Sequence, residues 1–200
     1  MKKRIYSLGS NRVLKVSKNY QEIIFIDKNT GKYCCFTQPR WATFMLVIDE
    51  IELQLQRVLA GQQVKYCYHL GAAWYVSVTS GYKCVDFCRF FIPLGETDVK
   101  PTRTGLALRI SEWRTLTSVI KQLHSDQPEI ANCMPCFLST DHTTAEGIRS
   151  CLECTPFQQL SATTDAHTSS SAAAATVTSA VTAAAAATVW SHVSGFRPTY

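Results

Sequence analysis

The chain has 200 residues, enough for one or two small domains, and its apolar content of 46% is ordinary for a globular protein. Only 18% of the residues are charged and the net charge is +5, so the composition permits a polyanionic partner without requiring one. The start, MKKRIYSLGS, lacks the apolar run of a signal peptide. Together with nine cysteines, this favours a reducing compartment, in which cysteines are core residues or metal ligands.

The N-terminal two thirds of the chain contain a weak internal repeat with a spacing of 62 positions and no gap. The matched pairs are mainly apolar or turn residues: Leu8 with Leu70, Val16 with Val78, Phe25 with Phe87, Pro39 with Pro101, Leu46 with Leu108, Ile48 with Ile110, and Glu50 with Glu112. We interpret the repeat as a diverged tandem duplication, with a first unit at 8–61 and a second unit at 69–124.

Each unit is expected to contain about four short antiparallel strands and then one helix. In the second unit, Trp74, Val76 and Val78 alternate with other residues as on one face of a strand. Apolar residues then recur at steps of three and four, as on one face of a helix: Ile110, Trp113, Leu116, Ile120 and Leu123, with Ser111 as a candidate cap. The first unit repeats this pattern at Ile48, Ile51, Leu55 and Val58, with Asp49 as its candidate cap.

The predicted fold class is therefore α+β, with two curved antiparallel β-meanders, each followed by one α-helix. A unit of about sixty residues buries too little apolar surface to be robust alone. We therefore expect the two units to pack as a pseudo-dimer, either within one chain or across a homodimer.

The second unit resembles the positive cofactor four family of transcriptional coactivators, which bind single-stranded DNA. The resemblance is carried by an Arg-containing strand, VDFCRFF at 85–91, a short turn, a basic loop with Pro and Gly, KPTRTGLAL at 100–108, and a helix with an early Trp, Trp113. It covers about half of the second unit. It implies a groove between paired sheets that accepts unpaired strands.

Binding of single strands requires cations along the phosphates and aromatic faces for the bases. The resemblance and this chemistry together give a candidate nucleic-acid-binding set. The candidate cations are Lys100, Arg103 and Arg89, and the candidate stacking residues are Trp74, Tyr75, Tyr82 and Trp113. For Trp113, a place on the apolar face of the helix is an equally good interpretation.

The resemblance implies a nuclear protein that binds single-stranded nucleic acid, DNA rather than RNA, with little sequence specificity, and that contacts the transcription machinery. A protein-interaction or scaffold module that kept only the fold is the alternative. This alternative is favoured by Thr104, which stands where the family has a Lys, and by the first unit, whose loop at 38–43 lacks both the Lys and the Gly.

The segment at 130–158 is predicted to be a zinc knuckle. Cys151 and Cys154 are separated by two residues, so both thiolates can reach one ion. The preferred ligand set adds Cys136 and His142, and the alternative set replaces His142 with Cys133. Either set of four protein ligands would make a structural site, because no coordination position stays open for a substrate.

The remaining chain, 161–200, is rich in Ala, Thr and Ser and is expected to be a disordered tail rather than a membrane span. No phosphate-binding loop, dinucleotide motif or convincing carboxylate pair occurs in the sequence. We therefore expect a binding protein and not an enzyme.

Overall fold

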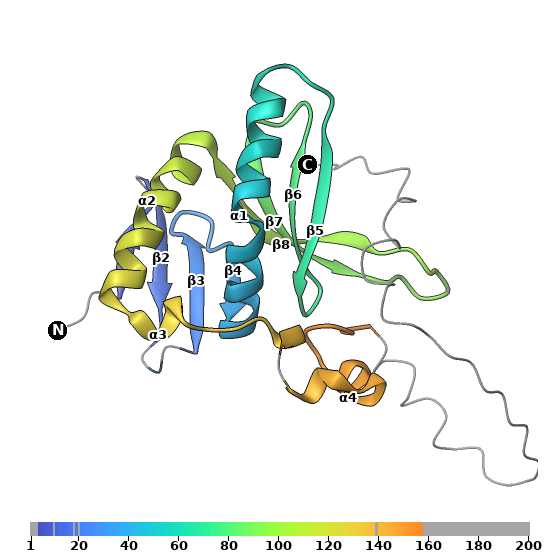
Figure 1. Cartoon of the computed structure of the whole chain (residues 1–200). Coiled ribbons are helices and arrows are strands. Elements are labelled where there is room, and N and C mark those ends of the chain that lie inside the picture. Colours follow the sequence, from blue (N-terminus) through green and yellow to red (C-terminus); the bar gives the residue numbers. More distant parts are fainter. Residues whose placement is uncertain (1–3, 10, 18, 20, 139, 158–200) are drawn as a thin grey trace, which may run out of the picture.

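The computed structural model describes residues 4–9, 11–17, 19, 21–138 and 140–157 (Figure 1). The first sheet contains β1 (Ile5–Ser7), β2 (Arg12–Val16), β3 (Glu22–Asp27) and β4 (Tyr33–Thr37), in that order, and is followed by α1 (Gln38–Leu59). The second sheet contains β5 (Lys65–Gly71), β6 (Trp74–Thr79), β7 (Cys84–Phe91) and β8 (Lys100–Arg109), and is followed by α2 (Ile110–Asp126). All neighbouring strands are antiparallel, which confirms the predicted α+β class and its two four-stranded sheets.

Short elements complete the described chain: α3 (Pro128–Ala131), η1 (Cys136–Leu138), η2 (Thr140–Thr143) and α4 (Ala145–Ser150). The tail predicted at 161–200 lies outside the residues that the structure describes. Within those residues, no helix combines the length and the apolar character that crossing a membrane requires.

The strand pairing of the first sheet recurs in the second sheet 62 positions later. Leu14 lies opposite Phe25 in the β2–β3 ladder, and Val76 lies opposite Phe87 in the β6–β7 ladder. The β1–β2 and β5–β6 ladders are related by the same spacing. The repeat seen in the sequence is therefore also a repeat of register over the first three strands of each sheet.

Beyond the third strand, the ungapped match of the two units is wrong. Thr37 and Arg109, the residues that precede the two helices, are 72 positions apart, because the β7–β8 hairpin contains ten more residues than the β3–β4 hairpin. Consequently Pro39 lies in α1, whereas Pro101 lies in β8. The matches of Leu46 with Leu108, Ile48 with Ile110 and Glu50 with Glu112 fail for the same reason.

This insertion also explains why the first helix begins earlier than predicted. α1 starts at Gln38, and the Thr37 hydroxyl accepts a hydrogen bond from the backbone N–H of Arg40, as an N-cap residue does. Pro39 occupies the first turn, where its missing N–H costs nothing. Asp49, predicted as the cap, lies in the middle of α1.

At α2 the predicted start is nearly right, but the cap is not. Ser111 is already the second residue of the helix. The Glu112 carboxylate accepts a hydrogen bond from the backbone N–H of Arg109 at 2.8 Å, so the acidic residue of the first turn satisfies a free donor at this helix end.

Both sheets and both long helices contribute to one apolar core. Phe25 and its counterpart in the repeat, Phe87, are in edge-to-face contact with ring centroids 5.5 Å apart. The indole N–H of Trp41 in α1 donates to His124 in α2 at 3.2 Å, and that of Trp113 in α2 donates to Glu52 in α1. The two indoles are 72 positions apart, and so are their two acceptors. The same indole hydrogen bond therefore runs in both directions between α1 and α2.

The extra length of the β7–β8 hairpin forms an arm, residues 89–104, that projects from the body of the molecule (Figure 1). At its base, the ladder shifts register between Cys88 and Phe90. Opposite this bulge, a Cβ atom at Gly105 would collide with the carbonyl oxygen of Phe87 and would lie 2.9 Å from the Cα of Cys88. The close approach of the two strands at the base of the arm therefore requires glycine at position 105.

We expect Gly105→Ala to lower the free energy of unfolding by about 1–3 kcal/mol, because the added methyl group meets backbone atoms that cannot rotate away. Urea denaturation followed by tryptophan fluorescence measures the change. Thr104→Ala, at the exposed neighbouring position, is the matched control and should cost less than about 0.5 kcal/mol. Equal stability of the two variants would show that the strands do not approach closely at this point.

Candidate metal centre and nucleic-acid interface

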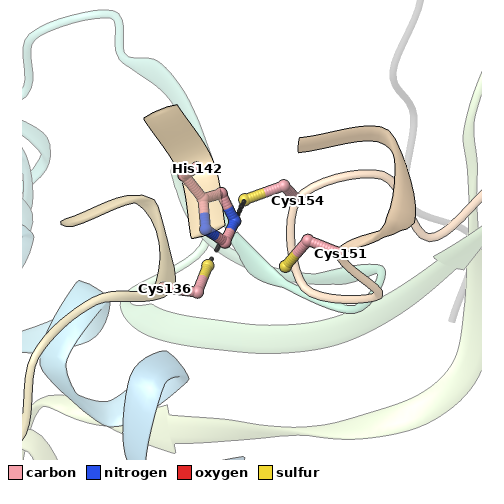
Figure 2. Close-up of side chains that lie close together, drawn as sticks. All are labelled: Cys136, His142, Cys151 and Cys154. Atoms are coloured by element: carbon pink, nitrogen blue, oxygen red, sulfur yellow. Dashed lines mark hydrogen bonds between the residues drawn. The ribbon is translucent and has the colours of Figure 1, made fainter. Parts of the chain in front are cut away.

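Cys136, His142, Cys151 and Cys154 lie together, with one ligand atom from each within 4.8 Å of all the others (Figure 2). They come from η1, from η2 and from the segment directly after α4. Cys154 is in contact with two of its partners: its Sγ lies 3.3 Å from the Sγ of Cys136 and 3.3 Å from Nε2 of His142. The preferred ligand set is therefore the one that the structure brings together.

Cys133, the alternative ligand, lies outside this cluster. Its thiol donates to the carbonyl oxygen of Ile130 at 2.9 Å, and its side chain packs against the main apolar core. Cys133 is thus a separate thiol just after α3, and His142 is the fourth member of the cluster.

Three thiols and one imidazole are a suitable donor set for a tetrahedral metal ion. Burial raises the pKa of Cys136, and its hydrogen bond with Cys154 acts in the same direction. Burial also raises the pKa of Cys154. Because a metal ion binds the thiolate form, metal binding at such a cluster would release protons. A metal ion held by all four side chains would have no open coordination position, as in structural sites.

Sequence analysis missed Glu153, which lies between the two ligands Cys151 and Cys154. Its carboxylate accepts hydrogen bonds from Nε and Nη2 of Arg40 at 3.2 and 3.1 Å and from the hydroxyl of Thr37 at 2.8 Å. The Arg40 side chain is almost fully buried at the start of α1. The sequence around Glu153 does not identify its partners, because they are more than 110 positions away.

The candidate phosphate-binding cations all lie on or beside the arm and are exposed. Lys100 forms an exposed ion pair with Glu96 at 2.6 Å. Arg103 lies in the bulged stretch of β8, and Arg89 lies opposite this stretch in β7. The structure therefore gathers these three predicted residues on one hairpin.

Three of the four aromatic residues predicted to stack on bases are buried, so they offer no free ring face. Trp113 is completely buried in the core, and Trp74 is 6% exposed. Tyr75 is 3% exposed, and its ring lies against both His69 and Phe90. Tyr82, in the β6–β7 turn, keeps part of its surface exposed but is not on the arm.

The aromatic residue that the arm does expose is Phe91, which sequence analysis did not select. Its side chain is 45% exposed, and Phe91 is paired directly with Lys100 across the β7–β8 ladder. Directly opposed residues of an antiparallel pair have their side chains on the same face. The run CRFF at 88–91 places two aromatic residues after Arg89, but which of their rings is exposed depends on the projection of the hairpin.

We expect Cys154→Ser to abolish stoichiometric metal binding. Loss of a supporting group beyond the ligands already costs about 10–100-fold in metal affinity, and removal of a thiolate should cost more. Titration with Co(II), followed by its d–d absorption bands, measures binding to the full chain. Cys133→Ser is the matched control and should bind like the wild type. Loss of metal binding in Cys133→Ser would show that Cys133 is a ligand.

Comparison of the chain with protein-family models, with curated proteins and with solved structures found no match. The likeness to the positive cofactor four family therefore rests on the residues of the second unit alone. The arm and the cysteine–histidine cluster are the features of the structure that bear on function.

Proposed function

We propose that this protein binds single-stranded or melted DNA with little sequence specificity, in the manner of a nuclear transcriptional coactivator. The observation that carries the proposal is the arm, on which an exposed ring and a cation are paired across two strands. Opposed side chains of this kind have Cβ atoms about 4.5–5.5 Å apart, so one nucleotide can stack on Phe91 while its phosphate meets Lys100.

The charges of the arm suit a polyanion that binds reversibly. The partner of Lys100 is Glu96, at an exposed position, and exposed ion pairs contribute little to stability. A phosphate can therefore replace Glu96 at small cost. Arg89 and Arg103 extend the positive charge toward the base of the arm, so a bound strand can follow the hairpin.

The same proposal includes an intramolecular pseudo-dimer of the two sheet-helix units, at 8–61 and 69–124. It is supported by the reciprocal indole hydrogen bonds between α1 and α2 and by the contact of Phe25 with Phe87. Reciprocal contacts between equivalent residues are typical of an interface with two-fold symmetry. Because the insertion occurs only in the second unit, the pair presents a single arm.

Zinc is the metal that we propose for the cysteine–histidine cluster. Thiolate and imidazole ligands in a closed tetrahedral set are typical of structural zinc sites. When bound, zinc would supply a fixed crosslink between η1, η2 and the chain that follows α4, and would supply no catalytic centre. The proposed function is accordingly binding rather than catalysis.

A second candidate function is supported by the apolar character of the arm. Phe91, Ile92 and Leu94 are all exposed, and Leu94 has no burial at all. Such side chains on a projecting hairpin also suit a protein partner, as in a scaffold or interaction module. The two candidate functions differ in the role of the cations, because an apolar protein contact does not require them.

We expect the double substitution Lys100→Ala/Arg103→Ala to weaken binding of a labelled single-stranded oligonucleotide and to reduce the slope of log K against log salt by about 1.4, given about 0.7 per phosphate contact on single strands. Fluorescence anisotropy at several salt concentrations measures both quantities. Lys28→Ala/Lys121→Ala removes the same charge from exposed positions away from the arm and should leave the slope unchanged. An unchanged slope in the arm variant would favour the scaffold function.

Phe91→Ala should weaken binding of the same oligonucleotide by about 5–150-fold, which corresponds to the roughly 1–3 kcal/mol of one stacked base. The salt dependence should stay as in the wild type, because no charge is removed. Phe137→Ala is the matched control, since Phe137 is exposed to a similar extent but lies in η1. Equal affinities of the two variants would show that Phe91 is not part of the binding surface.

A further inference from the structure

Arg40 depends on the metal-binding segment for its counter-charge. Its side chain is only 6% exposed, and its guanidinium group donates to both carboxylate oxygens of Glu153. Its guanidinium group also donates to the carbonyl oxygen of Cys35, which carries no net charge. A buried guanidinium without a carboxylate is strongly unfavourable, so this part of α1 is completed by a residue more than 110 positions away.

The start of α2 has the opposite arrangement at the equivalent position. Glu112, the third residue of α2, is acidic, whereas the third residue of α1 is Arg40. A Cβ atom at Gly9, in the β1–β2 turn, would lie 3.4 Å from the Glu112 side chain. A Cβ atom at Gly71, which is 62 positions after Gly9, would collide with the carboxylate of Glu153. Each of these turns therefore lies against a carboxylate. At the start of α2 the carboxylate belongs to the helix itself, whereas at the start of α1 it is supplied by Glu153.

The β5–β6 turn is held by the same residue. Ala72 and Ala73 have φ values of 46° and 65°, a left-handed conformation that is unfavourable for residues other than glycine. The backbone N–H of Ala72 donates to the carbonyl oxygen of Glu153 at 3.0 Å. Glu153 thus contacts the first helix through its side chain and the second sheet through its backbone. Figure 1 shows the segment with α4 next to the lower end of this hairpin.

We propose that metal binding by Cys136, His142, Cys151 and Cys154 positions Glu153 as a clamp that fixes the start of α1 against the β5–β6 turn. Glu153 lies inside the Cys151–Cys154 pair, so coordination of both thiolates determines where its backbone and carboxylate point. The surrounding elements have three, four and six residues, and several of their large apolar side chains are exposed. The metal is therefore the main source of order for the clamp. The clamp rests on the metal centre and not on the binding of DNA.

The test uses the full chain, loaded with Zn(II) or stripped of metal by a chelator, and hydrogen exchange at the amide of Ala72. Stripping the metal should raise this exchange rate by about tenfold or more, because the amide loses its acceptor. Glu153→Gln should bind Co(II) with the d–d absorption of the wild type, yet its melting temperature with metal should be lower by roughly 5–10 °C. The gain in melting temperature on metal binding should also shrink in this variant.

Glu146→Gln is the matched control, since Glu146 is an exposed residue of α4 and the substitution removes the same charge from the same segment. Its melting temperature and its gain on metal binding should equal those of the wild type. The clamp is overturned if Glu153→Gln keeps the full gain, or if Ala72 exchanges equally fast with and without bound metal. Failure of the wild type to bind Co(II) would overturn it too, and would leave the DNA-binding experiments on the arm unaffected.

Discussion

The apolar core shared by the two sheet-helix units is the constraint on which the rest of this molecule depends. Each sheet-helix unit is small, and its sheet has one face that must be covered by apolar surface. Both units solve this with one aromatic centre, in which Phe25, Phe36, Phe44 and Phe87 lie within 6.5 Å of one another, centroid to centroid. The two indole hydrogen bonds fix the helices at either side of this centre.

The two units share this core and differ in two additions that lie outside it. The insertion of ten residues lengthens one hairpin and places cations and an exposed ring away from the core. The segment with the cysteine–histidine cluster follows α3 and lies against the start of α1, where Glu153 pairs with the buried Arg40. The insertion and the C-terminal segment both depart from the repeat, and both lie outside the shared core.

The sequence allowed the α+β class, the two sheets and the clustering of Cys136, His142, Cys151 and Cys154 to be predicted, because alternation, helical spacing and a CxxC pair are local signals. The first helix was placed too late because an ungapped repeat forced Ile48 onto Ile110, and the insertion that breaks the repeat leaves no local mark. Trp74 and Tyr75 point to opposite faces of one strand, so exposure of at least one was a reasonable expectation. Both are buried, since His69 and Phe90 cover the second face.

The connection from α1 to β5 spans only residues 60–64. So short a linker keeps the partner surfaces of the two units at a high effective concentration, which separate chains would reach only in concentrated solution. Dilution therefore cannot separate the two units, and a stabilising change in either one strengthens both. A chain built in this way is also free to change the outer parts of one half while the core that both halves share is kept.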